Sequence, residues 1–391
     1  MATNRNTSRK ADAPRIVISG GGTGGHIFPA VSIAGAVRTL CPQAEILFVG
    51  AEGRMEMQRV PEAGYPIIGL PVAGFDRSHL WRNVAVVRKL LGSLWQARRI
   101  VRDFRPHVAV GVGGYASGPT LYMASRMGVP TLLQEQNSYA GVTNRLLAKR
   151  ASKICVAYDG MEAFFPKDKI LLTGNPVRQN LLDGNLTRAE AAAAFGLDPA
   201  LKTVLVVGGS LGARTINRTV AAMLPALRQR PRVQLIWQTG KGYVDEVRRA
   251  IQSATGAEQT GTSIPGLPGV YVSAFLSDMA RAYRAADLVV SRAGAGSISE
   301  LCLLGKAAVL VPSPNVAEDH QTKNALALST KGAALFVGDA DAAGKLPSAI
   351  FDTLEDDDLL ERLSHNAASL SMPHAAETIA REVLSLAGWA V

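Results

Sequence analysis

The sequence predicts an α/β protein of two domains, each built on a doubly wound and mostly parallel β-sheet. Short β-branched runs alternate with helix-length amphipathic stretches along the whole chain, and this alternation is typical of parallel sheets covered by helices. The chain has 391 residues, more than one ordinary core accommodates. A glycine-rich turn follows a strand-like run in both RIVISGGGTGGH and KTVLVVGGSLGA, which indicates two related halves.

The expected strands form two series. The first comprises residues 15–19, 45–49, 107–112, 130–134, 152–157 and 169–173, and the second comprises 203–207, 233–238, 269–273, 287–291, 307–311 and 333–337. The join falls in the turn-rich stretch 171–190, where Thr187 and Glu190 have the spacing of a capping box for the next helix. Because open α/β sheets bind ligands beyond the carboxyl ends of their strands, the site is expected between the halves.

Composition narrows the classes of function. The formal charge of +10 favours an anionic partner such as nucleic acid, a phosphorylated ligand or an acidic membrane surface. Cys41, Cys155 and Cys302 are far apart, lack metal-ligand spacing, and are expected to be reduced packing residues of a cytoplasmic protein. The polar N-terminal stretch lacks the long apolar run of a signal peptide, and no stretch approaches the length of a membrane span.

Glycine-rich turns are the first candidate binding elements. Gly20, Gly22 and Gly25 satisfy the GxGxxG pattern of dinucleotide sites, but Glu52 follows too late to be the usual ribose-binding acid. GGSLGAR at 208–214 places backbone amides and the hydroxyl of Ser210 at a helix start, and SRAGAGSISE at 291–300 repeats the design. Two such turns converging from one sheet can hold a diphosphate without a metal, although each glycine alone only permits a tight turn.

Further polar residues follow other strands. Glu300 suits the two hydroxyls of a ribose, or is an ordinary surface glutamate. Asn137 and Asn144 offer amide groups suited to sugar hydroxyls, or mark turns. The acidic stretch 354–363 is expected to be a solvent-facing helix start, and neither it nor 339–341 has the neighbours of a metal site.

A basic amphipathic stretch covers residues 75–106. The stretch contains eight Arg and Lys residues but only two Asp residues, and apolar residues including Trp81 and Trp95 alternate with the charged ones. Such a helix suits an anionic membrane surface. The alternatives are a core-facing helix with a solvated basic face, or a nucleic-acid contact, for which no binding module is recognised.

Seven motifs occur in order along the chain: GGTGGHIFPA, GGYASGP, QEQN, GNPVR, GGSLGAR, SRAGAGSISE and EDHQTKNA. Together they closely resemble the bacterial peptidoglycan N-acetylglucosaminyltransferase (MurG) family, from about Arg15 almost to the C-terminus. The resemblance implies a GT-B fold of two Rossmann-like domains, at 15–174 and 175–372, with a basic tail at 1–14 that we expect to be disordered. A last helix at 373–391 would return to the first domain.

The resemblance also implies an activity. Members of that family transfer N-acetylglucosamine from UDP-N-acetylglucosamine to the 4-hydroxyl of undecaprenyl-diphospho-N-acetylmuramoyl-pentapeptide (lipid I), with inversion, and so form lipid II for the cell wall. They work at the cytoplasmic face of the inner membrane. For this chain it implies no cofactor, no metal and no nucleic acid, an anionic membrane surface as a partner of 75–106, and association with the cell-wall and division machinery.

Site residues are carried over from the family position by position. The donor-sugar side would comprise Thr23, Gly24, Gly25, Asn137 and Gln321, and the diphosphate or its sugar would be faced by Arg178 and Ser210. The backbone of Leu276 would meet uracil, and the nucleotide would be wrapped by Ala295, Gly296, Ser297, Ile298, Ser299 and Glu300. Tyr115 and Asn144 are placed on the acceptor side. Ser297, Thr322 and Gly296 depart from residues found in other members, and no side-chain contact is carried over to Thr322.

A glycine-rich nucleotide-binding loop does not require a histidine, so the presence of His26 needs a separate explanation. Inverting transfer needs a base that takes the proton of the attacking hydroxyl, and a neutral imidazole at a helix start suits that role. The alternatives are that His26 shapes the loop or binds the diphosphate of the acceptor. Two other classes of function stay open on the residues alone, a nicotinamide-dependent oxidoreductase and a non-catalytic basic adaptor for nucleic acid or membrane.

Overall fold

The computed structural model describes residues 13–72, 83–177, 181, 185–209 and 211–389, without the side chains of 83–88 and 317. It forms two compact units. The first comprises residues up to Gln136, Ala140–Pro176 and His374–Val391, and the second comprises Asn137–Tyr139 and Val177–Pro373.

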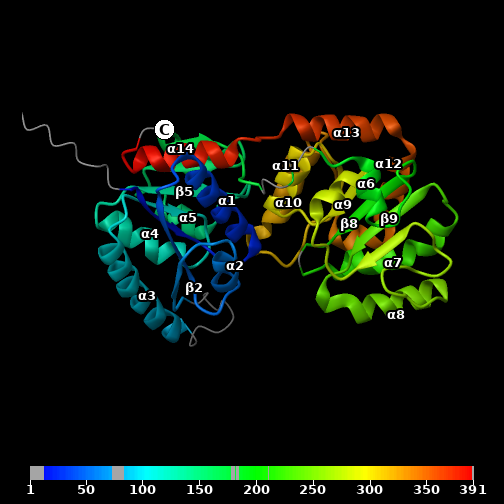
Figure 1. Cartoon of the computed structure of the whole chain (residues 1–391), viewed down its shortest axis with the longest axis horizontal. Helices are drawn as coiled ribbons and strands as arrows, with labels where there is room; N and C mark the ends of the chain where they lie inside the picture. Colours follow the sequence, from blue (N-terminus) through cyan, green and yellow to red (C-terminus); the bar gives the residue numbers. More distant parts are fainter. Residues whose placement is uncertain (1–12, 73–82, 178–180, 182–184, 210, 390–391) are drawn as a thin grey trace, which may run out of the picture. The chain divides into compact units, whose positions relative to one another are not determined.

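The first unit contains a sheet whose strands are all parallel (Figure 1). Within the described residues its order is β3-β2-β1-β4-β5-β6-β7. The strands are β1 (Arg15–Ser19), β2 (Glu45–Ala51), β3 (Ile67–Leu70), β4 (Val108–Gly111), β5 (Thr131–Glu135), β6 (Lys153–Val156) and β7 (Ile170–Leu172). The helices are α1 (Gly24–Leu40), α2 (Glu56–Glu62), α3 (Asn83–Phe104), α4 (Ser117–Arg126), α5 (Val142–Leu147) and α14 (Ala375–Leu386).

Period-two alternation in the strands separates the core of the first unit into two layers. Ile16 and Ile18 of β1 pack with α1 and α14 on one face. Val17 packs on the other face with residues of α3 and α4. The C-terminal helix α14 is therefore an integral part of the first unit, and it lies beside α1 (Figure 1).

The second unit repeats this order of parallel strands as β10-β9-β8-β11-β12-β13 within the described residues. These are β8 (Lys202–Val207), β9 (Val233–Gln238), β10 (Val270–Ser273), β11 (Leu288–Ser291), β12 (Ala307–Leu310) and β13 (Leu335–Phe336). The helices are α6 (Arg188–Ala193), α7 (Arg214–Arg228), α8 (Val244–Thr255), α9 (Met279–Ala285), α10 (Ala295–Leu303), α11 (His320–Ser329), α12 (Ala342–Glu355) and α13 (Asp357–Ser369).

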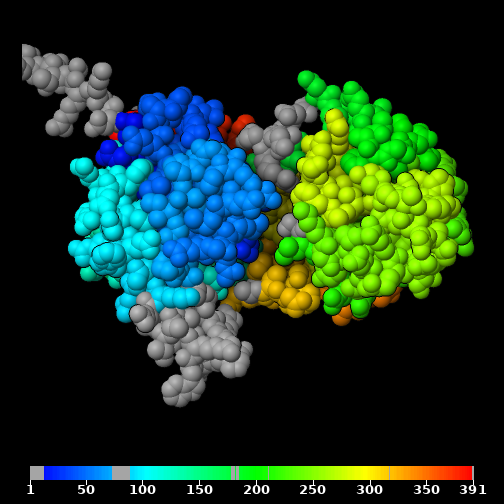
Figure 2. All heavy atoms as spheres, turned by 60° about the horizontal axis from the view of Figure 1, so that its bottom comes forward, coloured from blue at the N-terminus to red at the C-terminus, as the bar shows by residue number. Residues whose placement is uncertain are grey.

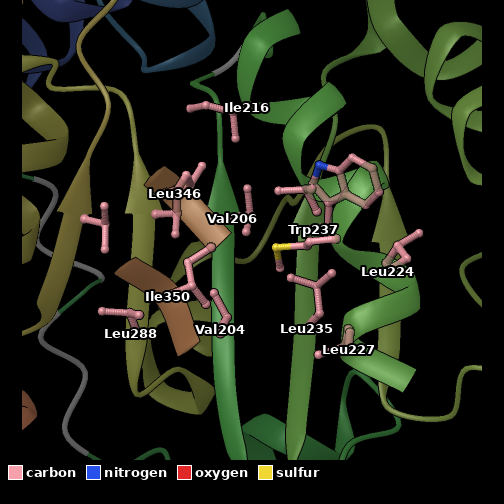
Figure 3. Packing of buried hydrophobic residues seen from close by; sticks show 14 of the residues in the cluster. Val204, Val206, Ile216, Leu224, Leu227, Leu235, Trp237, Leu288, Leu346 and Ile350 are labelled. Carbon is pink, nitrogen blue, oxygen red and sulfur yellow. The ribbon is translucent and has the colours of Figure 1, made fainter. Parts of the chain in front are cut away.

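The core of the second unit is centred on Trp237, which is fully buried (Figure 3). Its ring nitrogen donates a hydrogen bond to Oδ1 of Asn217 at 3.0 Å, so the buried indole N–H is satisfied. Val204 and Val206 of β8 pack with Leu346 and Ile350 of α12 in the same cluster. This core supports β8 and β11, the adjacent central strands at which the strand order of the sheet reverses.

All twelve strands expected from the sequence are present, within one or two residues at their ends. The short strand β3 was not expected. The capping box of Thr187 and Glu190 is confirmed, and α13 begins after Asp356, whose side chain accepts from the amide of Leu359.

All three cysteines are buried and free, and burial raises the pKa of Cys155 to about 12 and that of Cys302 to about 11.

Lys306 is a largely buried lysine between α10 and β12. Its Nζ donates to the carbonyl of Ala286 at 2.8 Å, and it lines a cavity of about 290 Å³. Burial lowers the pKa of Lys306 to about 8, with smaller contributions of opposite sign from Asp287 and Arg188. Because the unfolded chain holds this proton up to a pKa of about 10.4, a charged Lys306 costs stability below about pH 8, and that cost disappears as the pH rises toward 10.4.

We therefore expect Lys306→Met to stabilise the second unit by about 1–2 kcal/mol at pH 7, after the lost hydrogen bond to Ala286 is subtracted. The gain should vanish near pH 10. Urea unfolding at the two pH values measures it, and Lys345→Met, on an exposed lysine of α12, is the control. Equal stability of wild type and Lys306→Met at pH 7 would contradict the assigned burial cost.

Candidate functional site

The loop between β1 and α1 is built on glycine geometry, and His26 follows it in the first turn of α1. Gly22 has a φ of +87°, which an L side chain rarely adopts. A Cβ on Gly114, in the loop after β4, would lie 2.4 Å from the carbonyl oxygen of Gly21, so the two loops meet backbone to backbone. Strands β1 and β4 are also where the strand order reverses in the first sheet. Ligands of doubly wound sheets bind at that position.

His26 is held by the glycine loop that precedes its helix. Its Nδ1 lies 3.1 Å from the carbonyl oxygen of Gly21 and 3.2 Å from Oγ1 of Thr23. A Cβ on Gly113 would lie 2.9 Å from Nε2 of His26, so only a glycine allows the second loop to approach the ring this closely. The side chain is half-buried, and the ring is oriented from two sides.

Glu56, at the start of α2, occupies the position of an anion in this loop. Its Oε2 accepts from the amide of Gly22 at 3.0 Å, its Oε1 accepts from the amide of Ala51 at 3.0 Å, and the side chain is 1% exposed. The amide that a dinucleotide-binding loop would offer to phosphate is therefore taken by a carboxylate of the protein. This contact argues against the nicotinamide interpretation of Gly20, Gly22 and Gly25.

Residues predicted on the acceptor side differ in their exposure. Tyr115 is 59% exposed. Asn144 is buried, and its Nδ2 donates to Oε2 of Glu135 at 2.9 Å and to the carbonyl of Gln134 at 3.2 Å, while its Oδ1 has no partner among the described residues. The structure thus gives Asn144 a role in packing, and its contact with a sugar stays a prediction.

A cavity of about 480 Å³ lies in the second unit, a volume typical of ligand sites. It is lined by the loop after β8, the loop after β11 and the start of α10, together with Ser313, Pro314, Asn315, Gln321 and Asp339. β8 and β11 are the strands where the order of the second sheet reverses. The two units therefore carry their glycine loops at equivalent positions.

Two helices begin at this cavity without a side-chain cap. α7 begins after Ala213 and α10 begins after Gly294, and no acidic residue lies in the first turn of either helix. Their free amides and the positive ends of their dipoles are suited to an anion. Arg292 adds a cation at the wall, where it pairs with Asp339 and donates to the carbonyls of Val311 and Pro312.

The predicted nucleotide residues are distributed around α10. Ser297 and Gln321 line the cavity, and Oε1 of Gln321 accepts from the amide of Ser313 at 2.9 Å. Glu300 is buried and accepts from the hydroxyl of Tyr283 at 3.0 Å. The others on this helix are Ala295, Gly296, Ile298 and Ser299, of which Ser299 donates to the carbonyl of Ala295. Arg178 and Ser210 lie outside the described residues.

The side-chain amides of Gln238 and Asn324, two buried residues that were not predicted from the sequence, support these loops. Oε1 of Gln238 accepts from the amide of Leu276 at 2.9 Å, while its Nε2 donates to the carbonyl of Gly209 at 3.0 Å. Asn324 of α11 accepts from the amide and hydroxyl of Ser138, and its Nδ2 donates to Oδ1 of Asn137 at 3.2 Å. Asn324 lies inside the quoted EDHQTKNA motif, which was the available signal for it.

The described part of the chain contains no group of three or more His, Cys, Asp or Glu side chains that could hold a metal ion. In the same residues, no helix has the length and apolarity needed to cross a membrane.

Comparisons with known proteins agree with this architecture. The N-terminal domain of glycosyltransferase family 28 matches residues 16–156, and the C-terminal domain of that family matches residues 203–379. A Bacteroides fragilis protein named UDP-N-acetylglucosamine–N-acetylmuramyl-(pentapeptide) pyrophosphoryl-undecaprenol N-acetylglucosamine transferase is 62% identical over 99% of each chain. A protein of the same name from Cytophaga hutchinsonii is 50% identical over 95% of this chain and 96% of its own.

The structure comparison gives the same assignment. Acinetobacter baumannii MurG superposes with a TM-score of 0.75 at 28% identity, over 95% of this chain and 99% of that one. A glycosyltransferase of kitacinnamycin, at 18% identity and a TM-score of 0.69, shares the fold. The chain has the two-domain GT-B fold and belongs to the MurG family of glycosyltransferase family 28.

Proposed function

We propose that the chain transfers N-acetylglucosamine from UDP-N-acetylglucosamine to the 4-hydroxyl of lipid I and releases UDP and lipid II. The observation that carries the proposal is the cavity of about 480 Å³ in the second unit, with two uncapped helix starts around it. The names of relatives of up to 63% identity specify these substrates. Incorporation of radiolabelled N-acetylglucosamine into a lipid I analogue tests it, and absence of labelled product would refute it.

The reaction forms one bond and breaks one. The 4-hydroxyl oxygen of the acceptor attacks the anomeric carbon from the side opposite UDP, so an α-linked donor gives a β-1,4 product with inversion. The bond between that carbon and the diphosphate breaks, and the diphosphate takes the electron pair. His26 is proposed to take the hydroxyl proton as this happens.

The second unit is proposed to stabilise the leaving group. As the bond to the sugar breaks, negative charge grows on the diphosphate, and the amides at the starts of α7 and α10 can donate to it without reorganising. Arg178 and Ser210 are proposed to add a cation and a hydroxyl, and Glu300 to accept from the ribose. Thr23, Gly24, Gly25, Asn137 and Gln321 are proposed to hold the sugar, and Leu276 to meet uracil. We expect no cofactor and no metal requirement.

The first unit is proposed to rest on an anionic membrane surface, at the cytoplasmic face of the inner membrane. Part of the basic stretch 75–106 lies outside the described residues, but α3 exposes Leu91 and Trp95, with exposed fractions of 63% and 68%. Lys89, Arg98 and Arg99 are exposed on the same helix. Apolar and cationic side chains together suit a lipid headgroup surface. Contacts with the cell-wall and division machinery are a further expectation.

Neutralising this surface should weaken membrane binding without affecting the chemistry. We expect Lys89→Gln, Arg98→Gln and Arg99→Gln combined to reduce binding to vesicles of anionic phospholipid by about 100-fold, since each basic residue contributes about 1 kcal/mol there. Vesicle sedimentation measures the binding, and turnover of a soluble acceptor analogue should stay unchanged. The control combines Lys241→Gln, Arg248→Gln and Arg249→Gln, which removes three exposed charges from the second unit. Unchanged vesicle binding would place the membrane surface elsewhere.

A further inference from the structure

Glu56 is a buried carboxylate whose partners are backbone amides. It accepts from Gly22 and Ala51 at 3.0 Å each, and no Lys or Arg pairs with it among the described residues. The segment that contains β2, α2 and β3 forms a continuous part of the surface of the first unit (Figure 2), while the side chain of Glu56 points inward and is 1% exposed. Burying a carboxylate is costly unless hydrogen bonds compensate, so this placement requires those two amides.

One peptide group joins Glu56 to His26. The N–H of Gly22 and the C=O of Gly21 belong to the same peptide unit, and they point in opposite directions because the unit is planar and trans. The N–H donates to Oε2 of Glu56, and the C=O lies 3.1 Å from Nδ1 of His26. A carbonyl oxygen can only accept, so Nδ1 carries a proton in this contact.

This contact determines which ring nitrogen can act as a base. With the proton on Nδ1, the lone pair of the neutral ring lies on Nε2. A neutral histidine in water prefers the opposite arrangement, so the loop selects the less common tautomer. The hydroxyl of Thr23, 3.2 Å from Nδ1, can accept from the same N–H and does not reverse the assignment.

We propose that Glu56 is a positioning residue that fixes the tautomer and orientation of His26 through the Gly21–Gly22 peptide group. The carboxylate polarises the peptide, which makes its carbonyl a stronger acceptor for the Nδ1 proton. The arrangement corresponds to the carboxylate–histidine pair of hydrolases with one peptide unit inserted between the partners. The inference rests on the proposed function of His26 as the base.

The tether acts on a peptide group between two glycines, whose own torsions restrain it little. Gly21 and Gly22 have φ values of +152° and +87°, and a Cβ on Gly22 would meet nothing within 4 Å. Glycine loses more conformational freedom on folding than any other residue, so the peptide plane is poorly fixed by its own torsions. A Cβ on Gly21 would lie 2.0 Å from Oε1 of Glu56. Any larger residue at position 21 would therefore clash with the carboxylate where it approaches the peptide group.

Nitrogen-15 NMR of the imidazole tests the proposal without any turnover. Two-bond correlations show which ring nitrogen is protonated, and His26→Ala assigns the signal of His26. We expect the Nδ1–H tautomer in the wild-type protein. In Glu56→Gln the signal should move toward the Nε2–H tautomer, because the amide side chain lacks the charge and turns its NH2 toward one of the two backbone N–H donors. Glu62→Gln, an exposed change on the same helix, should leave the wild-type spectrum unchanged.

Kinetics provide the second measurement. We expect Glu56→Gln to lower kcat about 10–100-fold while the dissociation constant for UDP changes less than about twofold, since the cavity lies in the other unit. An Nε2–H tautomer in the wild-type protein would overturn the inference. Because this test uses the wild-type spectrum, it does not depend on whether Glu56→Gln folds. An unchanged tautomer and kcat in a folded Glu56→Gln protein would overturn it as well. A wild-type protein with the Nδ1–H tautomer but no transfer activity would refute the proposed function instead.

Discussion

Replacing His26 with alanine should lower kcat about 10²–10⁴-fold, which is the usual contribution of a positioned general base. The side chain belongs to the first turn of α1, directly after the glycine loop at the carboxyl end of β1, and Nδ1 is held by the carbonyl of Gly21. Without an imidazole, the attacking hydroxyl must lose its proton to water. Transfer would continue slowly, because the groups that we propose to stabilise the leaving diphosphate line the cavity of the second unit, where His26 does not lie.

Two measurements distinguish a catalytic base from a residue that only binds substrate. Loss of a base lowers turnover and leaves donor affinity nearly unchanged, whereas loss of a binding residue lowers both. We expect the dissociation constant of His26→Ala for UDP-N-acetylglucosamine to stay within about threefold of wild type, although its kcat falls. Single-turnover rates at saturating donor, together with calorimetric titration of the donor, measure both. His365→Ala, an exposed histidine of α13, is the control and should match wild type. Equal losses of turnover and donor affinity would contradict the role of base.

The strands could be predicted because parallel strands buried on both faces carry a continuous apolar signal. Ile16, Val17 and Ile18 are all fully buried, although they face two different layers. β3 was missed because its four residues include Gly69 and follow Pro66, so it lacks a β-branched run of ordinary length. It is an edge strand that the register with β2 holds in place.

The candidate site was predictable where local sequence determines local geometry. Glycine turns followed by helices identified the loops after β1, β8 and β11 from residue spacing alone, and the seven motifs identified the family. Glu56 was not found, since it meets Gly22 across 34 positions of sequence and looks like an ordinary first-turn acid of α2. Gln238 was missed for the same reason, because a buried side-chain amide that supports a distant loop leaves no local pattern. Asn324 lies inside a quoted motif, but its contacts with Asn137 and Ser138 depend on the fold.

Replacing Ser297 with aspartate should reduce the affinity for UDP by about 30- to 1000-fold. Ser297 lines the cavity in the first turn of α10, and no acidic residue lies in that turn. A carboxylate there would repel the diphosphate and would itself accept from the free amides of the helix start. At the effective dielectric constant of a partly solvated site, repulsion between like charges a few ångströms apart costs about 2–4 kcal/mol after screening.

The same substitution should leave the protein at least as stable as wild type. Carboxylates near a helix N-terminus stabilise it by about 0.3–1 kcal/mol, so binding and stability are expected to change in opposite directions. Calorimetric titration with UDP and thermal unfolding without ligand measure the two effects. Ala189→Asp, in the first turn of α6, adds the same charge at a helix start that does not line the cavity and should leave UDP affinity unchanged. Wild-type affinity for UDP in Ser297→Asp would exclude the start of α10 from the diphosphate site, because no anion could bind there beside an uncompensated carboxylate without a measurable loss.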